Sequence, residues 1–305
     1  MNLGVSLSST HSANGPALMI ERARVAHTSG VSSLTIGDHH NMGVPYAQNT
    51  PMLARMLAEW PDRPAGCLFL VPLWHPLFMA EHIGTLAAMH DDVFIVQTGI
   101  GWGEDQFAAF GAELSTRGRV LEIAVPAIKA LLAGERIDVP EFSMIGARVG
   151  LLPPTDRTIE WWIAGGVDVA VRRAARLGDA WYSSAGAGLE DTRHAMELYR
   201  SAGGQRAVAR LDGLILEDGD AARAEAEALV AKGYRGQTMD QLLVGTPDDV
   251  AEKIADFGHA GFDDIMFRCM NAPQELALET LTHLGAINAT VCAREENDQG
   301  QPAQN

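Results

Sequence analysis

Short apolar runs alternate with longer amphipathic segments along this 305-residue chain. The run at 65–71 (AGCLFLV) is apolar throughout, which is typical of a strand that is buried on both faces of a parallel sheet. In the stretch GTPDDVAEKIADFGHAG near the C-terminus, Thr246 can cap a helix whose apolar residues recur at helical spacing from Val250 onwards. The pattern therefore predicts strands and helices in alternation.

Eight apolar runs predict eight strands, each followed by a helical segment. The strands are expected at 2–8, 32–37, 65–71, 92–101, 158–166, 179–184, 207–216 and 262–268. Parallel strands need crossover helices between them, so these units predict an α/β fold, a single-domain (β/α)8 TIM barrel. A doubly wound open sheet is the structural alternative, but no GxGxxG motif follows the first strand, which weakens a dinucleotide-binding fold.

Two segments fall outside this alternation. Residues 133–158 are rich in proline and glycine and predict an insertion that passes over one face of the barrel. The barrel domain is expected to cover residues 1–290. The remaining tail, 291–305, ends in a polar, uncapped sequence, so we expect it to be disordered.

Composition excludes several classes of protein. The chain has 39 acidic and 23 basic residues and a net charge of -16, whereas nucleic acids and anionic membranes attract basic surfaces. The three cysteines lie far apart without a CxxC motif, which predicts neither a disulfide framework nor a structural zinc site. The N-terminus lacks the pattern of a signal peptide, and no apolar stretch reaches the roughly 18 residues of a membrane span, so we expect a cytoplasmic protein.

In such barrels the active site lies at the C-terminal ends of the strands. The candidates that follow predicted strands are Asp38, His39, His40, Trp74, His75, Gly99–Asp105, Gly165, Gly166, Ser183, Ser184, Gly186, Arg268 and Met270. Met42, Trp74 and Trp102 can line an apolar pocket for a flat ring or a hydrophobic substrate. The glycine pair before the helix at 167–178 leaves free N–H groups that can bind an anion, although a plain tight turn is the alternative.

The sequence lacks the motifs that are expected for a metal site or for a catalytic nucleophile. The first strand carries no HxH motif, and the spacing of His75, His82 and His90 indicates a packing stripe, so no metal site is predicted. There is no GxSxG motif, and Cys67 lies inside an apolar strand, where a thiol is inert. The candidate site therefore consists of one or two histidines, aromatic residues and an anion-binding helix end. Such a set is what a protein needs when a cofactor carries the reaction.

Several stretches resemble the luciferase-like monooxygenase family, the flavin barrels that include bacterial luciferase and the deazaflavin (coenzyme F-420) dehydrogenases. They are SLTIGDHH, VPLWHPLFMAEHIGTL, GIGWGEDQFAAFG followed by RGRVLE, IAGGVDVAVRRAARLGDAWY, and VGTPDDVAEKIADFGHAGFDDIMFR. Together they span about residues 1–285 in the family's order, and the GIGW stretch is the most specific of them.

The resemblance implies roles for individual residues. His39 matches the histidine beside the reactive edge of the flavin, where an imidazole can act as general acid or base, and a loop histidine without chemistry is the alternative. His40 is expected to support His39, and with Met42, Trp74 and Trp102 it completes the predicted substrate pocket. The implied cofactor site contains Cys67, Leu68, Thr98, Gly99, Gly165, Gly166, Val167 and Ala170, with the last four around the flavin 5′-phosphate.

Two further details come with the resemblance. It places a non-prolyl cis peptide bond at Cys67–Leu68, and it turns Thr98 and Gly99 toward the ring. Bacterial luciferase has an arginine and a reactive cysteine after the fourth strand, where this chain has Ile100 and Gly99. Phosphate binding would therefore depend on backbone groups, with Arg172 or Arg173 as candidate side chains.

The leading hypothesis is a monooxygenase that uses reduced FMN and O₂ on a small organic substrate. A dehydrogenase that depends on coenzyme F-420 is the alternative, but its anionic tail favours basic surroundings, and the acidic chain favours FMN. A non-catalytic flavin-binding protein and a metal-dependent hydrolase are hypotheses of other classes. No nicotinamide motif is present, so a separate flavin reductase is a candidate partner. Residues 52–60 (MLARMLAEW) are either a homodimer surface or a core-facing helix.

Overall fold

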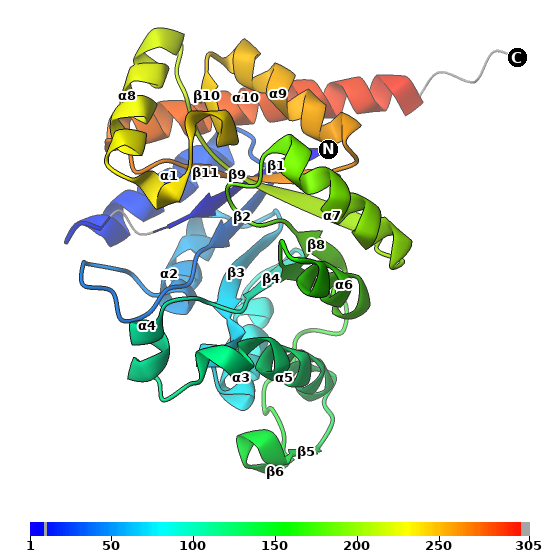
Figure 1. Cartoon of the computed structure of the whole chain (residues 1–305). Helices are drawn as coiled ribbons and strands as arrows, with labels where there is room; N and C mark the ends of the chain where they lie inside the picture. Colours follow the sequence, from blue (N-terminus) through cyan, green and yellow to red (C-terminus); the bar gives the residue numbers. More distant parts are fainter. Residues whose placement is uncertain (9–10, 300–305) are drawn as a thin grey trace, which may run out of the picture.

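The computed structural model describes residues 1–8 and 11–299, the stretch 294–299 through its backbone alone. Parallel strands form a closed barrel, because β11 pairs with both β1 and β9, and β8 pairs with β9 (Figure 1). The strands of the barrel are β1 (Asn2–Leu7), β2 (Ser33–Ile36), β3 (Ala65–Leu70), β4 (Phe94–Gly99), β7 (Ile159–Ala164), β8 (Ala180–Tyr182), β9 (Arg206–Ile215) and β11 (Asp264–Cys269). These are the eight strands that the apolar runs predict, so the TIM barrel is confirmed and the open sheet is excluded.

Helices surround the barrel and cover the outer faces of its strands (Figure 1). They are α1 (Gly15–Thr28), α2 (Asn49–Met56), α3 (Pro76–Ala88), α4 (Glu104–Ala109), α5 (Arg117–Leu132), α6 (Asp168–Leu177), α7 (Leu189–Ser201), α8 (Gly219–Ala231), α9 (Pro247–His259) and α10 (Gln274–Gln299). Short 3₁₀ turns are η1 (Leu57–Glu59), η2 (Val71–Leu73), η3 (Leu114–Thr116), η4 (Pro140–Phe142), η5 (Tyr234–Gly236) and η6 (Met239–Gln241). Among the described residues, no helix has both the length and the apolar character that crossing a membrane requires.

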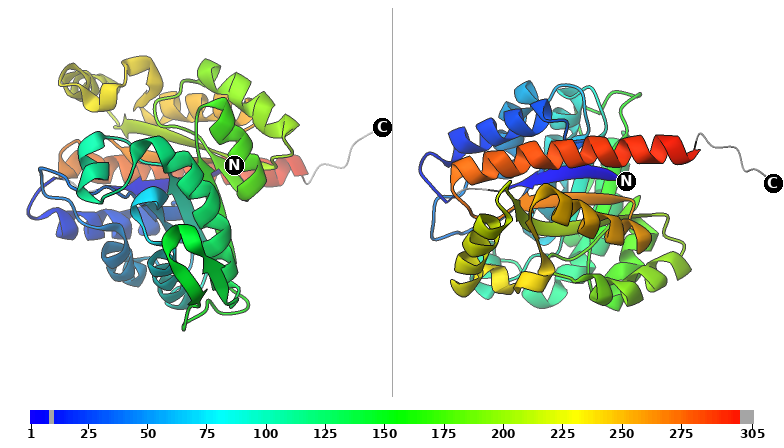
Figure 2. Two further views of the ribbon diagram at one scale, coloured as in Figure 1. Left: turned by 60° about the horizontal axis from the view of Figure 1, so that its bottom comes forward. Right: turned by 90° about the horizontal axis from the view of Figure 1, so that it is seen from above.

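Helix α10 runs past the predicted end of the barrel domain. Figure 2 shows it as a long rod beside α1, and it stays helical through residues 291–299. The prediction of a disordered tail is therefore wrong for 291–299, because alanine, arginine and glutamate in AREE continue a helix that is already nucleated. Residues 300–305 lie outside the described part of the chain.

The insertion predicted at 133–158 is present as an antiparallel pair, β5 (Ile137–Val139) and β6 (Met144–Ala147). It packs on the outside of the barrel near α3 and α5 (Figure 1) rather than over one of its faces. The carbonyl of Phe142 lies 3.2 Å from His75 Nε2, and a Cβ on Gly84 of α3 would lie 2.5 Å from the carbonyl oxygen of Leu151.

A second insertion, between β9 and α9, contains α8, η5, η6 and a strand that the apolar pattern does not predict. This strand, β10 (Leu242–Gly245), pairs with the last residues of β9, from Asp212 to Ile215, beyond the closed ring. The insertion therefore brings the segment around η5 to the C-terminal end of β9, where an active site is expected.

The barrel interior is filled in layers. An apolar layer in the middle consists of Ile95, Trp162, Ala180, Tyr182, Val208 and Met266. Alternation along the strands places a polar layer above it, toward the C-terminal ends, with Gln97 on β4, Arg210 and Asp212 on β9, and Arg268 on β11. The apolar layer closes the barrel from below, so the polar layer is the floor of its C-terminal mouth.

Candidate active site

The loop after β2 places His39 at the mouth of the barrel. Its ring is half-buried, with its centroid 6.0 Å from that of Tyr46 and 6.2 Å from that of Trp102. Burial lowers the pKa of His39; Asp38 opposes this shift, while His40 and the Arg235 guanidinium add to it. The imidazole is therefore held in its neutral form near pH 7, in which one ring nitrogen can accept a proton.

Asp38 anchors this loop to the end of β3. Its Oδ2 accepts hydrogen bonds from the Leu70 N–H and from Trp74 Nε1–H, each 2.8 Å long. Its Oδ1 lies 3.2 Å from His40 Nε2. The carboxylate is buried, so it fixes the backbone that carries His39. Sequence reasoning placed Asp38 at a strand end but gave it no role.

The four predicted pocket residues do not form one group. Trp102 lies beside His39 and is 74% exposed at the rim of the mouth. His40 and Trp74 instead pack against each other, with ring centroids 6.0 Å apart, and Trp74 also stacks on Phe78 of α3. Met42 is half-buried in the loop that joins β2 to α2. In this arrangement Trp102 is the predicted pocket residue that contacts the candidate acid or base.

The peptide bond between Cys67 and Leu68 is trans, as are the other peptide bonds of the described residues. The predicted cis bond is therefore wrong, and β3 continues its regular pairing with β4 through both residues. Burial raises the pKa of the Cys67 thiol well above its ordinary value. The carbonyl of Leu68 accepts a 2.7 Å hydrogen bond from Asn49 Nδ2, which joins α2 to this strand.

Thr98 faces away from the mouth, so the prediction that it faces the ring is wrong. Side chains alternate along a strand, and Ile95 belongs to the interior layer, so Gln97 and Gly99 share its face and Thr98 lies on the other. Gln97 is the polar residue that β4 contributes to the mouth. Its Nε2 is buried and has no hydrogen-bond partner among the described residues.

The predicted phosphate site lies where β7 meets α6. Helix α6 begins at Asp168 after Val167, without a side-chain cap. The Ala170 N–H donates a 2.8 Å hydrogen bond to the carbonyl of Val167, so the N–H groups of Asp168 and Val169, which have no partner among the described residues, are the ones that can bind an anion. A Cβ on Gly165 would lie 2.4 Å from the Cβ of Ala170, and one on Gly166 would lie 2.6 Å from Ser184 Oγ. Gly165 therefore leaves no room for a side chain, whereas a Cβ at Gly166 would have to displace the Ser184 side chain.

The arginines considered for that site lie elsewhere. Arg173 is buried, and its Nε lies 2.9 Å from Glu122 Oε1, while Arg172 is exposed. Asp168 at the start of α6 lies 3.2 Å from the imidazole of His194. Anion binding at this helix end would therefore depend on backbone N–H groups.

A cluster of arginines at the mouth was missed by the sequence reasoning, apart from Arg268 as a strand-end residue. Arg268 is buried, and its Nη1 lies 3.2 Å from Asp212 Oδ2; Arg235 Nε lies 3.4 Å from the same oxygen. Burial alone would raise the pKa of Asp212, but Arg268, Arg210 and Arg235 together lower it. The signal in the sequence is ARLDG, which puts two charged residues at alternate positions of an otherwise apolar strand.

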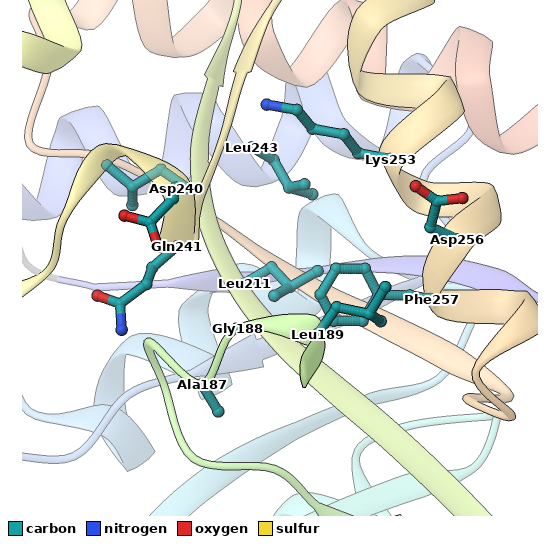
Figure 3. A pocket seen from close by; sticks show the side chains of 11 residues that line it. Ala187, Gly188, Leu189, Leu211, Asp240, Gln241, Leu243, Lys253, Asp256 and Phe257 are labelled. Atoms are coloured by element: carbon teal, nitrogen blue, oxygen red, sulfur yellow. The ribbon is translucent and has the colours of Figure 1, made fainter. Parts of the chain in front are cut away.

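A separate cavity of about 160 Å³ lies outside the barrel, between the start of α7, β9 and α9 (Figure 3). Its apolar lining includes Leu189, Leu211 and Phe257, and Lys253 lies at its edge (Figure 3). Leu211 alternates with Arg210 and Asp212, so this cavity is on the opposite side of β9 from the mouth. It contains none of the predicted site residues.

Comparison with known proteins identifies the family. The model of the luciferase-like monooxygenase family matches residues 1–239. The chain belongs to this family.

Among the described residues, no three His, Cys, Asp or Glu side chains come together in a group that could hold a metal ion.

The curated relatives that match this chain are named as F420-dependent glucose-6-phosphate dehydrogenases. An F420-dependent glucose-6-phosphate dehydrogenase of Rhodococcus erythropolis is 24% identical, over 87% of this chain and 91% of that protein. For F420-dependent glucose-6-phosphate dehydrogenase 1 of Rhodococcus jostii, also 24% identical, the match covers 58% of this chain and only 56% of the relative.

Solved structures of oxygenases share the fold. The monooxygenase RslO1 of Streptomyces bottropensis superposes with a TM-score of 0.76 at 20% identity, over 96% of this chain and 100% of that one. The oxygenating constituent of 3,6-diketocamphane monooxygenase from Pseudomonas putida, solved in complex with FMN, gives a TM-score of 0.75 at 15% identity, over 95% of this chain and 98% of that one.

The mouth suits the flavin or deazaflavin ring that this family implies. Buried polar atoms in proteins nearly always have hydrogen-bond partners. Several buried polar atoms of the mouth have none among the described residues: His11 Nδ1, Thr35 Oγ1, Gln97 Nε2, Arg210 Nε and Asp212 Oδ1. A ring system with carbonyl and N–H groups offers acceptors and donors to such atoms, and the start of α6 offers N–H groups to its phosphate.

Proposed function

We propose that this protein is an oxidoreductase that uses coenzyme F420 to interconvert a hydroxyl and a carbonyl group on a small substrate. The observation that carries the proposal is the position of His39, whose neutral imidazole lies at the mouth among polar atoms without partners. The curated relatives, named as F420-dependent dehydrogenases, support this choice of cofactor.

Each part of the mouth has a distinct task in this proposal. The N–H groups at the start of α6 bind the phosphate of the cofactor, and the glycines before it allow close approach. The bound deazaflavin would supply two-electron redox chemistry, so the protein has to position the substrate and transfer a proton to or from its oxygen. His39 takes the proton from a substrate hydroxyl, or returns it to a carbonyl oxygen, while Asp38 holds the loop that carries it.

The charge around the mouth favours the deazaflavin over FMN. The net charge of -16 argues against an anionic cofactor tail, but Arg210, Arg235 and Arg268 make the mouth locally cationic. The exposed indole of Trp102 also leaves the mouth accessible to water. Oxygenation by a reduced flavin needs water to be excluded, whereas hydride transfer does not depend on exclusion to the same extent.

A monooxygenase that uses reduced FMN and O₂ is the second candidate. The oxygenases that share this fold favour it, one of them bound to FMN. Turnover under anaerobic conditions separates the two. We expect the purified protein to reduce F420 without O₂ in the presence of an alcohol or sugar substrate from a panel. The reduction of F420 is followed spectroscopically. Activity that requires both O₂ and reduced FMN would instead support the second candidate.

A further inference from the structure

A buried glutamine on α4 joins the two loops that carry His39 and Trp102. The Oε1 of Gln106 accepts a 2.8 Å hydrogen bond from the backbone N–H of His40 in the loop after β2. Its Nε2 donates a 3.0 Å hydrogen bond to the carbonyl of Trp102 in the loop after β4. The side-chain amide thus uses both of its ends, one on each loop, and the residue is only 5% exposed.

Helix α4 holds this glutamine in a fixed place. The next residue, Phe107, is 1% exposed and packs against Leu70 at the end of β3. The N–H of Leu70 donates in turn to the Asp38 carboxylate. The loop after β2 is therefore fixed on both sides of the candidate acid or base, by Asp38 before it and by the bond from His40 after it.

Trp102 has little packing of its own to hold it. Its side chain is 74% exposed, and the glycines on either side, Gly101 and Gly103, have φ of +69° and +89°. Glycine adopts such angles readily but also leaves them readily, so the turn does not fix itself. The bond from Gln106 to the Trp102 carbonyl therefore orients the backbone from which the indole extends toward His39, with ring centroids 6.2 Å apart.

The other links around these loops are longer and exposed. Asn41 Nδ2 donates a 3.2 Å hydrogen bond to the carbonyl of Asp105, and Gln48 Nε2 lies 3.4 Å from the carbonyl of His39. Water competes for such exposed groups, so their net contribution is small, whereas a buried amide has no solvent to replace its partners. Gln106 is therefore the strongest polar link between the two loops.

We propose that Gln106 is a positioning residue that keeps the His39 imidazole and the Trp102 indole in register across the mouth. The proposal deepens the proposed function and rests on it, because an effect of Gln106 on turnover requires that His39 transfers the proton. The effect of Gln106 on the His39 ring itself needs neither cofactor nor substrate, so it can be measured separately.

The first measurement is the pKa of His39 in the full-length protein, from an NMR titration with isotope-labelled histidine in which His39→Gln assigns the signal. Burial lowers this pKa. In Gln106→Met the loop loses its bond and the ring becomes more exposed, so we expect the pKa to rise toward the ordinary value of 6.5.

Asn288→Leu is the matched control, because Asn288 forms the same kind of amide bridge at the other end of the barrel. It is buried, its Oδ1 accepts a 2.8 Å hydrogen bond from the N–H of Leu3, and its Nδ2 donates a 2.9 Å hydrogen bond to the carbonyl of Gly30. Loss of this bridge should lower stability and leave the pKa of His39 unchanged. Circular dichroism verifies folding, and Gln106→Asn, whose amide is too short to span both loops, replaces Gln106→Met if that variant does not fold.

The second measurement is kcat in a double-mutant cycle. Gln106→Met should lower kcat about ten- to a hundredfold, as a displacement of about 1 Å implies. In the His39→Gln background the same substitution should have little further effect, because Gln106 acts through His39. Asn288→Leu should leave kcat unchanged.

Three results would overturn the positioning role. They are an unchanged His39 pKa in folded Gln106→Met, an equal rise of that pKa in Asn288→Leu, and a full loss of kcat on Gln106→Met in the His39→Gln background. A rise of the pKa that is confined to Gln106→Met, in a protein that turns over with neither F420 nor FMN, would contradict the proposed function and leave the positioning of His39 by Gln106 standing.

Discussion

The indole N–H of Trp74 donates a 2.8 Å hydrogen bond to Oδ2 of Asp38, the residue before His39. The same oxygen accepts the N–H of Leu70, so one buried carboxylate joins the ends of β2 and β3. Trp74 therefore supports the active-site loop from behind, and it does so through the polar edge of an otherwise apolar side chain.

Removal of the Asp38 carboxylate should destabilise the protein. Asp38→Ala leaves two buried donors unpaired, at about 1–3 kcal/mol each, so we expect the free energy of unfolding to fall by about 3 kcal/mol. Trp74→Phe removes the indole N–H and its hydrogen bond to Asp38, so the free energy of unfolding should fall by only about 1 kcal/mol. Urea unfolding measures both, with Asp91→Ala as control, since Asp91 is 95% exposed. Equal stability of Asp38→Ala and Asp91→Ala would show that Asp38 is not an anchor.

His39→Gln should lower kcat by about 10²- to 10⁴-fold, the usual contribution of a positioned acid or base. Glutamine keeps a polar side chain but cannot transfer a proton, so cofactor affinity should change little. Steady-state kinetics and F420 titration measure the two effects separately. His259→Gln is the control, because His259 is exposed on α9. An unchanged kcat in His39→Gln would remove His39 from the chemistry.

Stability should decline as the pH falls below the usual histidine pKa of 6.5, because burial lowers the pKa of His11, His39, His82 and His90 in the folded protein. The unfolded chain binds protons near 6.5 and the folded protein binds them only at lower pH, so acid favours unfolding in that window. Urea midpoints at about pH 7.5 and 5.5 test this.

His90 offers the sharpest variant for that experiment. Its side chain is fully buried, and its Nε2 has no partner among the described residues. His90→Asn should therefore reduce the loss of stability on acidification, while the exposed His259→Asn should leave the loss unchanged. A stability that is equal at the two pH values in the original protein would contradict the account.

Gly66→Ala should be strongly destabilising. A Cβ at this position in β3 would lie 1.8 Å from the carbonyl oxygen of Ile95 in β4, so the two strands would have to separate. We expect a loss of about 3 kcal/mol or more, at the upper end for an overpacked interior. Gly150→Ala has no neighbouring atom within 4 Å and serves as the control in thermal unfolding. Similar melting temperatures for the two variants would show that β3 and β4 are not held this closely.

The sequence predicts the barrel well because its strands are buried on both faces and are therefore apolar throughout. It also predicts the position of His39 at the mouth, since the end of a strand in a parallel barrel defines the active face. The extension of α10 to Gln299 is harder to predict, because its last turns contain good helix formers in a polar sequence without an apolar stripe.

Other features depend on information that a single sequence does not contain. An apolar strand does not reveal which of its faces points inward, so the sequence does not show that Gln97, and not Thr98, faces the mouth. Trp74 looks like a pocket residue until its bond to Asp38 is seen. Arg235 reaches the site only because glycines on both sides allow an unusual turn in an insertion, and long-range folding decides where that turn lies.

Equilibrium binding of F420 to the full-length protein, followed by its fluorescence, tests the central claim most directly. We expect saturable binding at one site, competition by FMN, and weaker binding in Gly166→Ala, where a Cβ would lie 2.6 Å from Ser184 Oγ. Gly150→Ala should bind like the original protein. The absence of binding for F420, FMN and reduced FMN alike would contradict the claim that this mouth holds a flavin or deazaflavin.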